Sequence, residues 1–206
     1  MKNLLICSYL AGIAPQFHDF MANRVTQDKE ILLIPTAGNV ETYTAYLEEG
    51  KALLDKSGYR ITTLDVAVET QARCQQAIGD AKAICILGGN TFYLLQELKK
   101  KQLIESLRDK LMTGCPYIGE SAGGIILTKD IGYSHIMDDP TLGPDLTDTS
   151  SLDVINFYPL PHYIEAPFTD SVTTTFQTYH QQLTLVPINN QQAIQVKHTE
   201  ITVHLG

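Results

Sequence analysis

Residues 117–125 read YIGESAGGI, and this stretch decides the fold that the sequence predicts. An apolar run changes there to small residues, and Ser121 lies between two glycines, each two positions away. A strand that turns sharply into a helix needs such small residues, because larger ones would clash as the chain doubles back. Two interpretations follow from the pattern. It is an ordinary strand-to-helix turn, or it is a turn that exposes Ser121 as a nucleophile.

Four apolar runs of strand length precede this turn, with helical stretches between them. Continuous apolar runs are typical of parallel strands that helices cover on both faces. Gly58 is a natural end for the helix between the second and third runs, and Asn90 can cap the helix after the fourth. The runs are residues 3–8, 30–36, 61–66 and 83–89, and a further helix is expected at 104–112. The alternation predicts a three-layer α/β/α fold with a mostly parallel central sheet.

The second half of the chain has a different pattern. Residues 130–153 are rich in Gly, Pro, Asp, Ser and Thr, which predicts a long ordered loop, and loops of this length in compact domains usually have a function. After the run VINFYPLPHY, we expect a helix at 168–182 and closing strands at 183–188, 193–198 and 201–206. There is no internal repeat and no linker, so residues 1–206 are predicted to form a single domain.

Composition excludes some classes of partner. The chain has 206 residues and a formal net charge of -8, from 15 Lys and Arg against 23 Asp and Glu. This balance argues against nucleic acids and anionic membranes as partners, because phosphate binding needs clustered cations. The four cysteines have no metal-ligand spacing, and free thiols predict a cytoplasmic location. The oligomeric state stays open, with a homodimer as one alternative.

A nucleophilic serine needs a base, usually an imidazole that a carboxylate orients. Of six histidines, His162 stands out because it ends an apolar run in which Pro159 and Pro161 fix the backbone. The alternative is a core or turn histidine that bonds a backbone carbonyl. Asp138 and Asp139 are the leading carboxylate candidates, although an Asp-Asp-Pro sequence is also ordinary turn chemistry.

Together these residues resemble the peptidase E family, which comprises serine dipeptidases that cleave aspartyl dipeptides and have a class I glutamine-amidotransferase-like fold. Cyanophycinase, a more distant relative, shares the G-G-N/D and G-x-S-A-G elements. The resemblance rests on LGGNTFYLL at 87–95, YIGESAGG at 117–124 and NFYPLPHY at 156–163, and IPTAGN at 34–39 fits the family's second strand and its loop.

The resemblance implies a role for each matched residue. Ser121 is then the nucleophile, His162 the general base, and an aspartate of the intervening loop the third member, with Asp138 matching best and Asp139 one step off. An oxyanion hole is implied at a backbone N–H of Gly89 or Asn90, together with that of Ala122. Neither a metal nor an organic cofactor is implied.

Three departures from the family pattern bear on the substrate. Aspartyl dipeptidases often have a bulky aromatic residue before the serine, where this chain has Glu120. The turn that carries a late acidic residue in other members reads PINNQQ here, so Asn190 replaces the carboxylate. The late helix has no arginine, which is the residue that would bind a substrate carboxylate.

The hypothesis is a serine peptidase that hydrolyses dipeptides or other short peptides through Ser121, His162 and Asp138. A second hypothesis keeps this machinery and changes the substrate to an isoaspartyl or cyanophycinase-like amide. A third is a non-catalytic binding protein on the same fold, which Glu120 and the missing arginines favour.

Overall fold

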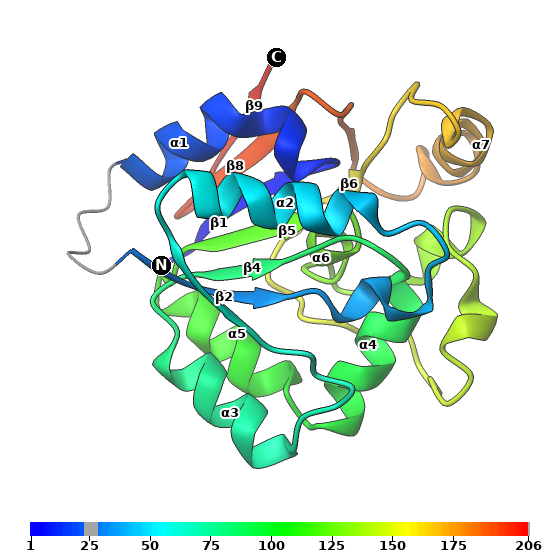
Figure 1. The fold of residues 1–206 in the computed structure, drawn as a ribbon. Coiled ribbons are helices and arrows are strands. Elements are labelled where there is room, and N and C mark those ends of the chain that lie inside the picture. Colours follow the sequence, from blue (N-terminus) through cyan, green and yellow to red (C-terminus); the bar gives the residue numbers. More distant parts are fainter. Residues whose placement is uncertain (23–28, 206) are drawn as a thin grey trace.

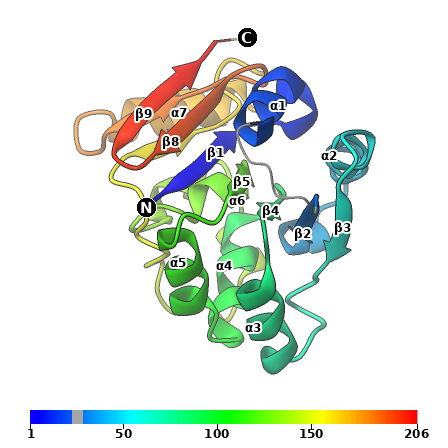
Figure 2. The ribbon, with the colours of Figure 1, turned by 90° about the vertical axis from the view of Figure 1, so that its left-hand side faces the viewer.

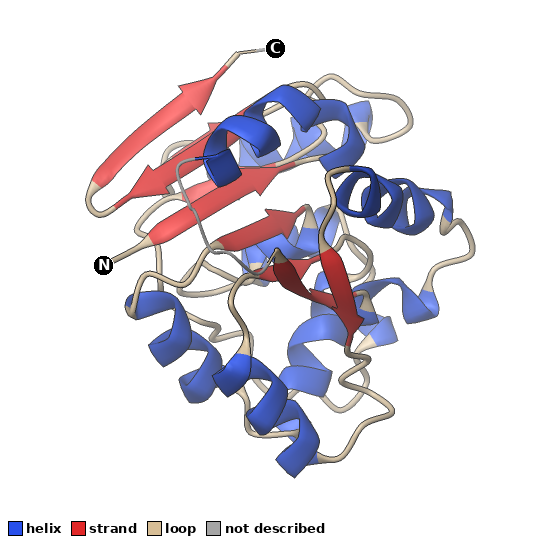
Figure 3. Ribbon diagram, turned by 60° about the vertical axis from the view of Figure 1, so that its left-hand side comes forward, coloured by secondary structure: helices blue, strands red, loops and turns tan. Residues whose placement is uncertain are grey.

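The computed structural model describes residues 1–22 and 29–205, in which helices flank a central seven-stranded sheet (Figures 1 and 3). The strand order is β3-β2-β4-β5-β1-β8-β9. The first five strands in this order run parallel, and β8 and β9 are antiparallel additions at one edge. The strands are β1 (Asn3–Cys7), β2 (Glu30–Ile34), β3 (Arg60–Thr63), β4 (Ile84–Ile86), β5 (Tyr117–Glu120), β8 (Ala193–Lys197) and β9 (Glu200–His204).

The central strands are apolar throughout because both of their faces are buried. Successive side chains of a strand point to opposite faces. In β1, Leu4 and Ile6 therefore face one layer of helices, whereas Leu5 and Cys7 face the other. The layer above Leu5 and Cys7 contains α1 (Ala14–Ala22) and α2 (Ala45–Lys56), and the opposite layer contains α3 (Gln71–Asp80), α4 (Thr91–Lys100) and α5 (Ile104–Met112), as Figures 1 and 2 show.

The three-layer α/β/α prediction is confirmed, and several local predictions hold to the residue. Helix α5 has the expected bounds, Gly58 follows α2 with a φ of 80°, and the Asn90 side chain accepts a hydrogen bond from the Tyr93 N–H at 2.9 Å to cap α4. Helical stretches are expected between the strands, but the sequence predicts no bounds for α1 and α3. Each buries only three side chains, which leaves a weak apolar stripe in the sequence.

A second, two-stranded sheet pairs β6 (Tyr158–Leu160) with β7 (Leu185–Pro187) in parallel, and α7 (Thr169–Tyr179) lies between them in sequence. The expected strand at 183–188 therefore forms in part, but it joins β6 and not the central sheet. The long segment 130–153 contains two 3-10 turns, Gly132–Ile136 and Pro140–Leu142. The expected final strand ends at His204, and Gly206 lies outside the described residues.

Parallel pairing places the carboxyl ends of β1, β2, β4 and β5 at the same edge of the central sheet. Ligands of open α/β sheets bind in the crevice outside these ends. Ser8 follows β1, Gly88 follows β4, and Ser121 follows β5, so the fold collects them at this edge. None of the helices in the described ranges is long and apolar enough to cross a membrane.

The turn between β5 and α6 (Ala122–Ile125) depends on glycine at two positions. A Cβ atom on Gly119 would lie 2.5 Å from the carbonyl oxygen of Gly123, and one on Gly123 would lie 2.3 Å from the carbonyl oxygen of Ile86. Backbone atoms occupy both places, so no side-chain rearrangement could make room. The glycine spacing that stands out in the sequence therefore reflects the close packing of α6 on β4 and β5.

Replacing Gly123 by Ala should lower the free energy of unfolding by about 3 kcal/mol, because the new methyl group overlaps the Ile86 carbonyl. Gly79→Ala is the matched control. A Cβ on Gly79 meets no atom within 4 Å, so this variant should gain about 0.5–1 kcal/mol from its helical position in α3. Urea denaturation of both variants measures the difference. Equal stability of the two would show that the close approach at Gly123 does not exist.

Candidate functional site

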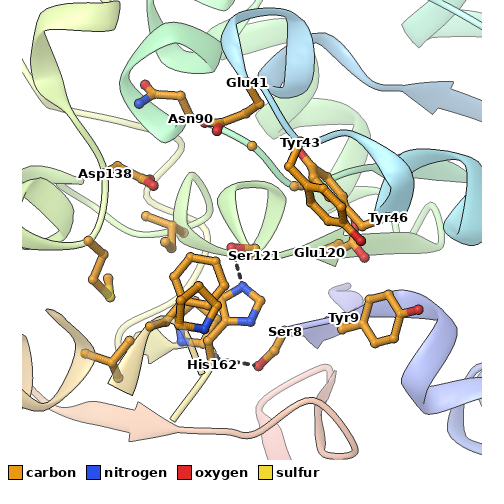
Figure 4. Close-up of a pocket in the computed structure, with 18 of the residues that line it drawn as sticks. Ser8, Tyr9, Glu41, Tyr43, Tyr46, Asn90, Glu120, Ser121, Asp138 and His162 are labelled. Carbon is orange, nitrogen blue, oxygen red and sulfur yellow. Dashed lines mark hydrogen bonds between the residues drawn. The ribbon is translucent and has the colours of Figure 1, made fainter. Parts of the chain in front are cut away.

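A cavity of about 860 Å³ lies at the carboxyl edge of the central sheet (Figure 4). This volume suits a small ligand. Segments that are far apart in the sequence form its walls, because each follows a different strand. They contribute Ser8 after β1, Glu41 and Tyr46 after β2, Gly88, Gly89 and Asn90 after β4, Ser121 after β5, His162 after β6 and Asn190 after β7.

Ser121 occupies the turn between β5 and α6 in a conformation that side chains rarely adopt. Its φ is 46° and its ψ is -107°. A residue other than glycine in this region is strained by about 1–3 kcal/mol and persists only where its surroundings fix it. Here the Ser121 N–H donates to the Cys7 carbonyl at 2.8 Å, which extends the β1–β5 pairing into the turn. The side chain thereby reaches the cavity (Figure 4).

The structure brings His162 against this serine, 41 positions away in the sequence. Its Nε2 lies 3.2 Å from Ser121 Oγ, as Figure 4 shows, and its Nδ1 lies 2.9 Å from Asn190 Oδ1. An amide oxygen can only accept a hydrogen bond, so Nδ1 carries the proton. In the neutral ring, Nε2 then has a free lone pair and accepts from the Ser121 hydroxyl. This is the tautomer that a general base needs.

Several contacts fix the imidazole of His162. Its backbone has a φ of 57°, its N–H donates to Ser8 Oγ at 3.0 Å, and its ring stacks on that of Phe168 with the centroids 4.5 Å apart. Burial lowers the pKa of His162 below its ordinary value, although the bond to Asn190 and the charge of Glu165 oppose this effect. The ring is therefore neutral at neutral pH and can take a proton.

The two predicted carboxylates lie elsewhere. Asp138 lines the cavity, but its Oδ2 accepts hydrogen bonds from the N–H and the hydroxyl of Thr91 at the start of α4. Asp139 accepts from the N–H and hydroxyl of Thr141 in its own turn. Segment 130–153 lies along α4, with bonds from its first turn to its last, and among the described residues Nδ1 of His162 is bonded to Asn190 and to no residue of this segment. Asn190 thus takes the place that the sequence assigned to Asp138.

The structure also shows which of the predicted oxyanion-hole N–H groups are already hydrogen-bonded. The N–H of Asn90 donates to the Ala37 carbonyl at 2.9 Å, so this group is already used. Within residues 1–22 and 29–205, no atom accepts a hydrogen bond from the N–H of Gly89 or Ala122. Gly89 has a φ of 129°, and a Cβ there would lie 2.3 Å from the Ala37 carbonyl, so only glycine brings the backbone to this place. Of the predicted donors, Gly89 and Ala122 remain.

Residues 4–204 of the chain match the model of peptidase family S51. The chain belongs to this family, the peptidase E family. An uncharacterized peptidase of Listeria innocua is 37% identical over 206 residues, which cover 100% of this chain and 98% of the relative. A protein named Peptidase E from Nostoc sp. is 30% identical over 158 residues, which cover 77% of this chain and 61% of the relative.

Two solved structures have the same fold as this chain. A crystal structure of a Listeria monocytogenes protein named after peptidase E has a TM-score of 0.93 at 33% identity, covering 99% of this chain and 98% of that one. A peptidase from an acI-B1 Actinobacterium shares the fold, with a TM-score of 0.73 at 19% identity over 99% of this chain and 87% of that one. The chain is accordingly a peptidase, of the serine type by family.

Three residues that shape this site have no strong signal in the sequence. Ser8 ends the first apolar run, and its hydroxyl donates to the Ile188 carbonyl at 3.0 Å while it accepts from the N–H of His162. Asn190 is not acidic, yet its Oδ1 lies 2.9 Å from Nδ1 of His162. Glu165 accepts from the N–H of Asn190 at 3.2 Å. A polar residue at a strand end was the only available signal for Ser8.

Glu120 is built into the site as a structural carboxylate. Its side chain is 1% exposed and accepts hydrogen bonds from two backbone groups, the N–H of Leu10 at 2.7 Å and the N–H of Gly88 at 3.0 Å. It therefore connects the turn at Ser121 to the glycine loop after β4. Burial raises the pKa of Glu120 from 4.5 to about 7, although the two bonds oppose this effect and Glu49 adds to it.

This raised pKa predicts a pH-dependent stability that Glu120→Gln should remove. Between pH 4.5 and about 7 the folded protein binds the Glu120 proton more tightly than the unfolded chain does, so the wild type loses stability as pH rises. The difference in unfolding free energy, wild type minus variant, should fall by about 3 kcal/mol between pH 4.5 and pH 8. Urea denaturation at both pH values measures it, and a constant difference would contradict the assignment.

Proposed function

We propose that this S51 peptidase hydrolyses short peptides through an acyl-enzyme, with Ser121 as nucleophile and His162 as general base. The Ser121 oxygen attacks the scissile carbonyl while its proton passes to Nε2 of His162. The imidazolium then gives this proton to the leaving amine, and a water molecule repeats the sequence to release the acid. In this scheme the turn at Ser121 is a nucleophile elbow.

One observation carries the proposal: Ser121 Oγ lies 3.2 Å from His162 Nε2 at the wall of the cavity. This separation is within the reach expected between a nucleophile and its base. The strained φ values of both residues add support, because strain of this kind is concentrated at active sites. A serine and a histidine packed only for stability would need neither this close approach of Oγ to Nε2 nor a strained backbone.

The oxyanion of the tetrahedral intermediate needs donors on the side of Ser121 that faces away from the base. We assign this role to the backbone N–H groups of Gly89 and Ala122, which have no acceptor among the described residues. Donors of this type each contribute about 3 kcal/mol to transition-state stabilisation. The bonds of Glu120 to Gly88 and of Asn90 to Ala37 hold the loop in place, so the donors are positioned before substrate binds.

Two residues share the role that one carboxylate has in a Ser-His-Asp triad. The amide oxygen of Asn190 fixes the tautomer of His162 but has no charge to stabilise the imidazolium. Glu165 supplies a negative charge, which raises the pKa of the imidazole, and it holds the backbone of Asn190. We propose that Asn190 orients the ring and that Glu165 stabilises its protonated form.

We propose that the substrates are short peptides because two segments of the chain wall the cavity on opposite sides. Segment 130–153 contributes Met137, Asp138 and Leu142 on one side, and the residues before and at the start of α7 contribute Phe168 and Val172 on the other. Both segments project beyond the sheet edge that carries Ser121 (Figure 1). An extended chain passing through the site would meet these walls, whereas a dipeptide fits in a volume of this size.

Ser121→Ala should lower kcat by roughly 10⁴-fold or more, because no other group can form the acyl-enzyme. The measurement is hydrolysis of a panel of dipeptides, combined with labelling by a serine-directed phosphonate. The wild type should be labelled at Ser121 only. Ser171→Ala, a serine on the exposed side of α7, is the matched control and should behave as the wild type. A wild-type protein that the phosphonate does not label would favour a non-catalytic binding protein.

Substitutions of Asn190 and Glu165 should move the acidic limb of the kcat/KM profile in opposite directions. Asn190→Asp adds a negative charge beside Nδ1, which stabilises the imidazolium, raises the pKa of His162 and moves the limb to higher pH. Glu165→Gln removes a charge, so the pKa falls and the limb moves to lower pH. Asn190→Leu should lower kcat by about 10² to 10⁴, because Nδ1 loses its acceptor. Profiles that do not move would exclude this pair from the proton transfer.

A further inference from the structure

The charges that line the cavity are of one sign. Five carboxyl groups line it, and among its described residues there is no Lys or Arg. The neutral His162 does not offset them. An anionic substrate group would therefore enter without a cationic partner, whereas a cationic group would enter a region of favourable potential. The five are Glu41, Glu49, Glu120, Asp138 and Asp139.

Four of these carboxyl groups accept hydrogen bonds from described residues. Glu120 binds two backbone N–H groups, Glu49 accepts from the Tyr9 hydroxyl at 2.7 Å, and Asp138 and Asp139 each accept through one oxygen from a threonine. Within the described part of the chain, no group donates to the carboxylate of Glu41 or to Oδ1 of Asp138. Both side chains are partly buried, which raises the pKa of Glu41 and raises that of Asp138 to about 6.

A third group near these carboxylates also has no partner. The hydroxyl oxygen of Tyr46 is buried and makes no hydrogen bond to any described residue. Burial raises the pKa of Tyr46, and the negative charges of Glu41, Glu120 and Asp138 raise it further, because all three carboxyl groups line the same cavity. Figure 4 shows Glu41, Tyr46 and Asp138 around Ser121 on the side away from His162. Buried polar groups normally have partners, so a ligand is expected to supply them here.

The side chains of Glu41, Tyr46 and Asp138 indicate which kind of ligand group would bind in this part of the cavity. Two carboxylates and a phenol oxygen are acceptors, and the rings of Tyr43 and Tyr46, with centroids 6.2 Å apart, add faces that attract cations. An ammonium group offers three donors and a positive charge. We infer that the peptides cleaved at Ser121 carry an amino group that binds between Glu41, Tyr46 and Asp138. This inference rests on the proposed function. It excludes aspartyl peptides as preferred substrates.

The amino group has two possible sources, the free amino terminus of the peptide and a lysine-like side chain. Matched substrates separate them. Lysyl and norleucyl dipeptides differ in side-chain charge at equal length, and each can be used with a free or an acetylated amino terminus. We expect kcat/KM to fall at least tenfold on loss of the amino group from whichever source binds. Aspartyl dipeptides should have the lowest values.

Substitutions test which residues cause the preference for a substrate with a charged amino group. Glu41→Gln and Tyr46→Phe should each reduce the preference for the charged substrate at least threefold. Glu48→Gln is the matched control, because it removes the same charge from the exposed first turn of α2, outside this cavity. It should leave the preference unchanged. Equal kcat/KM for charged and neutral substrates, or a preference for aspartyl peptides, would overturn the inference while leaving the peptidase proposal intact.

A binding measurement keeps the test independent of turnover. Calorimetry with the Ser121→Ala variant should give a Kd at least tenfold lower for the charged dipeptide than for its neutral counterpart. Equal Kd values would overturn the inference whether or not the wild type is active. Tighter binding of the charged peptide without wild-type turnover or phosphonate labelling would instead refute the proposed function and uphold the cation site.

Discussion

The hydroxyl of Ser8 joins the two sheets at the point where the site forms. It accepts from the N–H of His162 and donates to the carbonyl of Ile188, both at 3.0 Å. One bond thus holds the segment after β6 and the other holds the segment after β7, while Ser8 itself continues β1 beside β5. Ser8 therefore contributes to the placement of His162 beside Ser121, because no strand pairing among the described residues connects the central sheet to the small one. A buried hydroxyl with both functions satisfied is well suited to this task.

Burial acts on the titrating groups of the site in one direction. It disfavours charge, so it lowers the pKa of His162 and raises those of Glu120 and Asp138. For the histidine this produces a base that is free at neutral pH. For Glu120 it produces a carboxylate that keeps its charge only because two backbone N–H groups solvate it. The same desolvated environment therefore keeps the ring of His162 free to accept a proton. It also makes Glu120 easier to protonate, which weakens the bonds of this carboxylate to the N–H groups of Leu10 and Gly88.

Sequence patterns predicted the fold and singled out Ser121 and His162, which the structure brings together, because the signals at these places are local. The continuous apolar runs reflect strands buried on two faces, and the glycines around Ser121 reflect backbone atoms that occupy the place of a Cβ. The partner of His162 depends on how β6 and β7 pair across the 24 residues between them, 161–184, and no local pattern encodes that register. A search for an acid therefore favoured Asp138. Asn190 has the required acceptor oxygen, but an asparagine in a turn is too common to attract notice.

The absence of arginine from α7 has a structural counterpart in the cavity. Because the lining has five carboxyl groups and no Lys or Arg, the site cannot offset its own negative charge. Partial protonation relieves part of this charge, since the pKa values of Glu120 and Asp138 are about 7 and about 6. Hydrogen bonds from described residues reach four of the five groups, and they leave Glu41 and Oδ1 of Asp138 without a donor. Carboxylates of like charge in one cavity disfavour one another, and a cationic substrate is the partner that would complete this site.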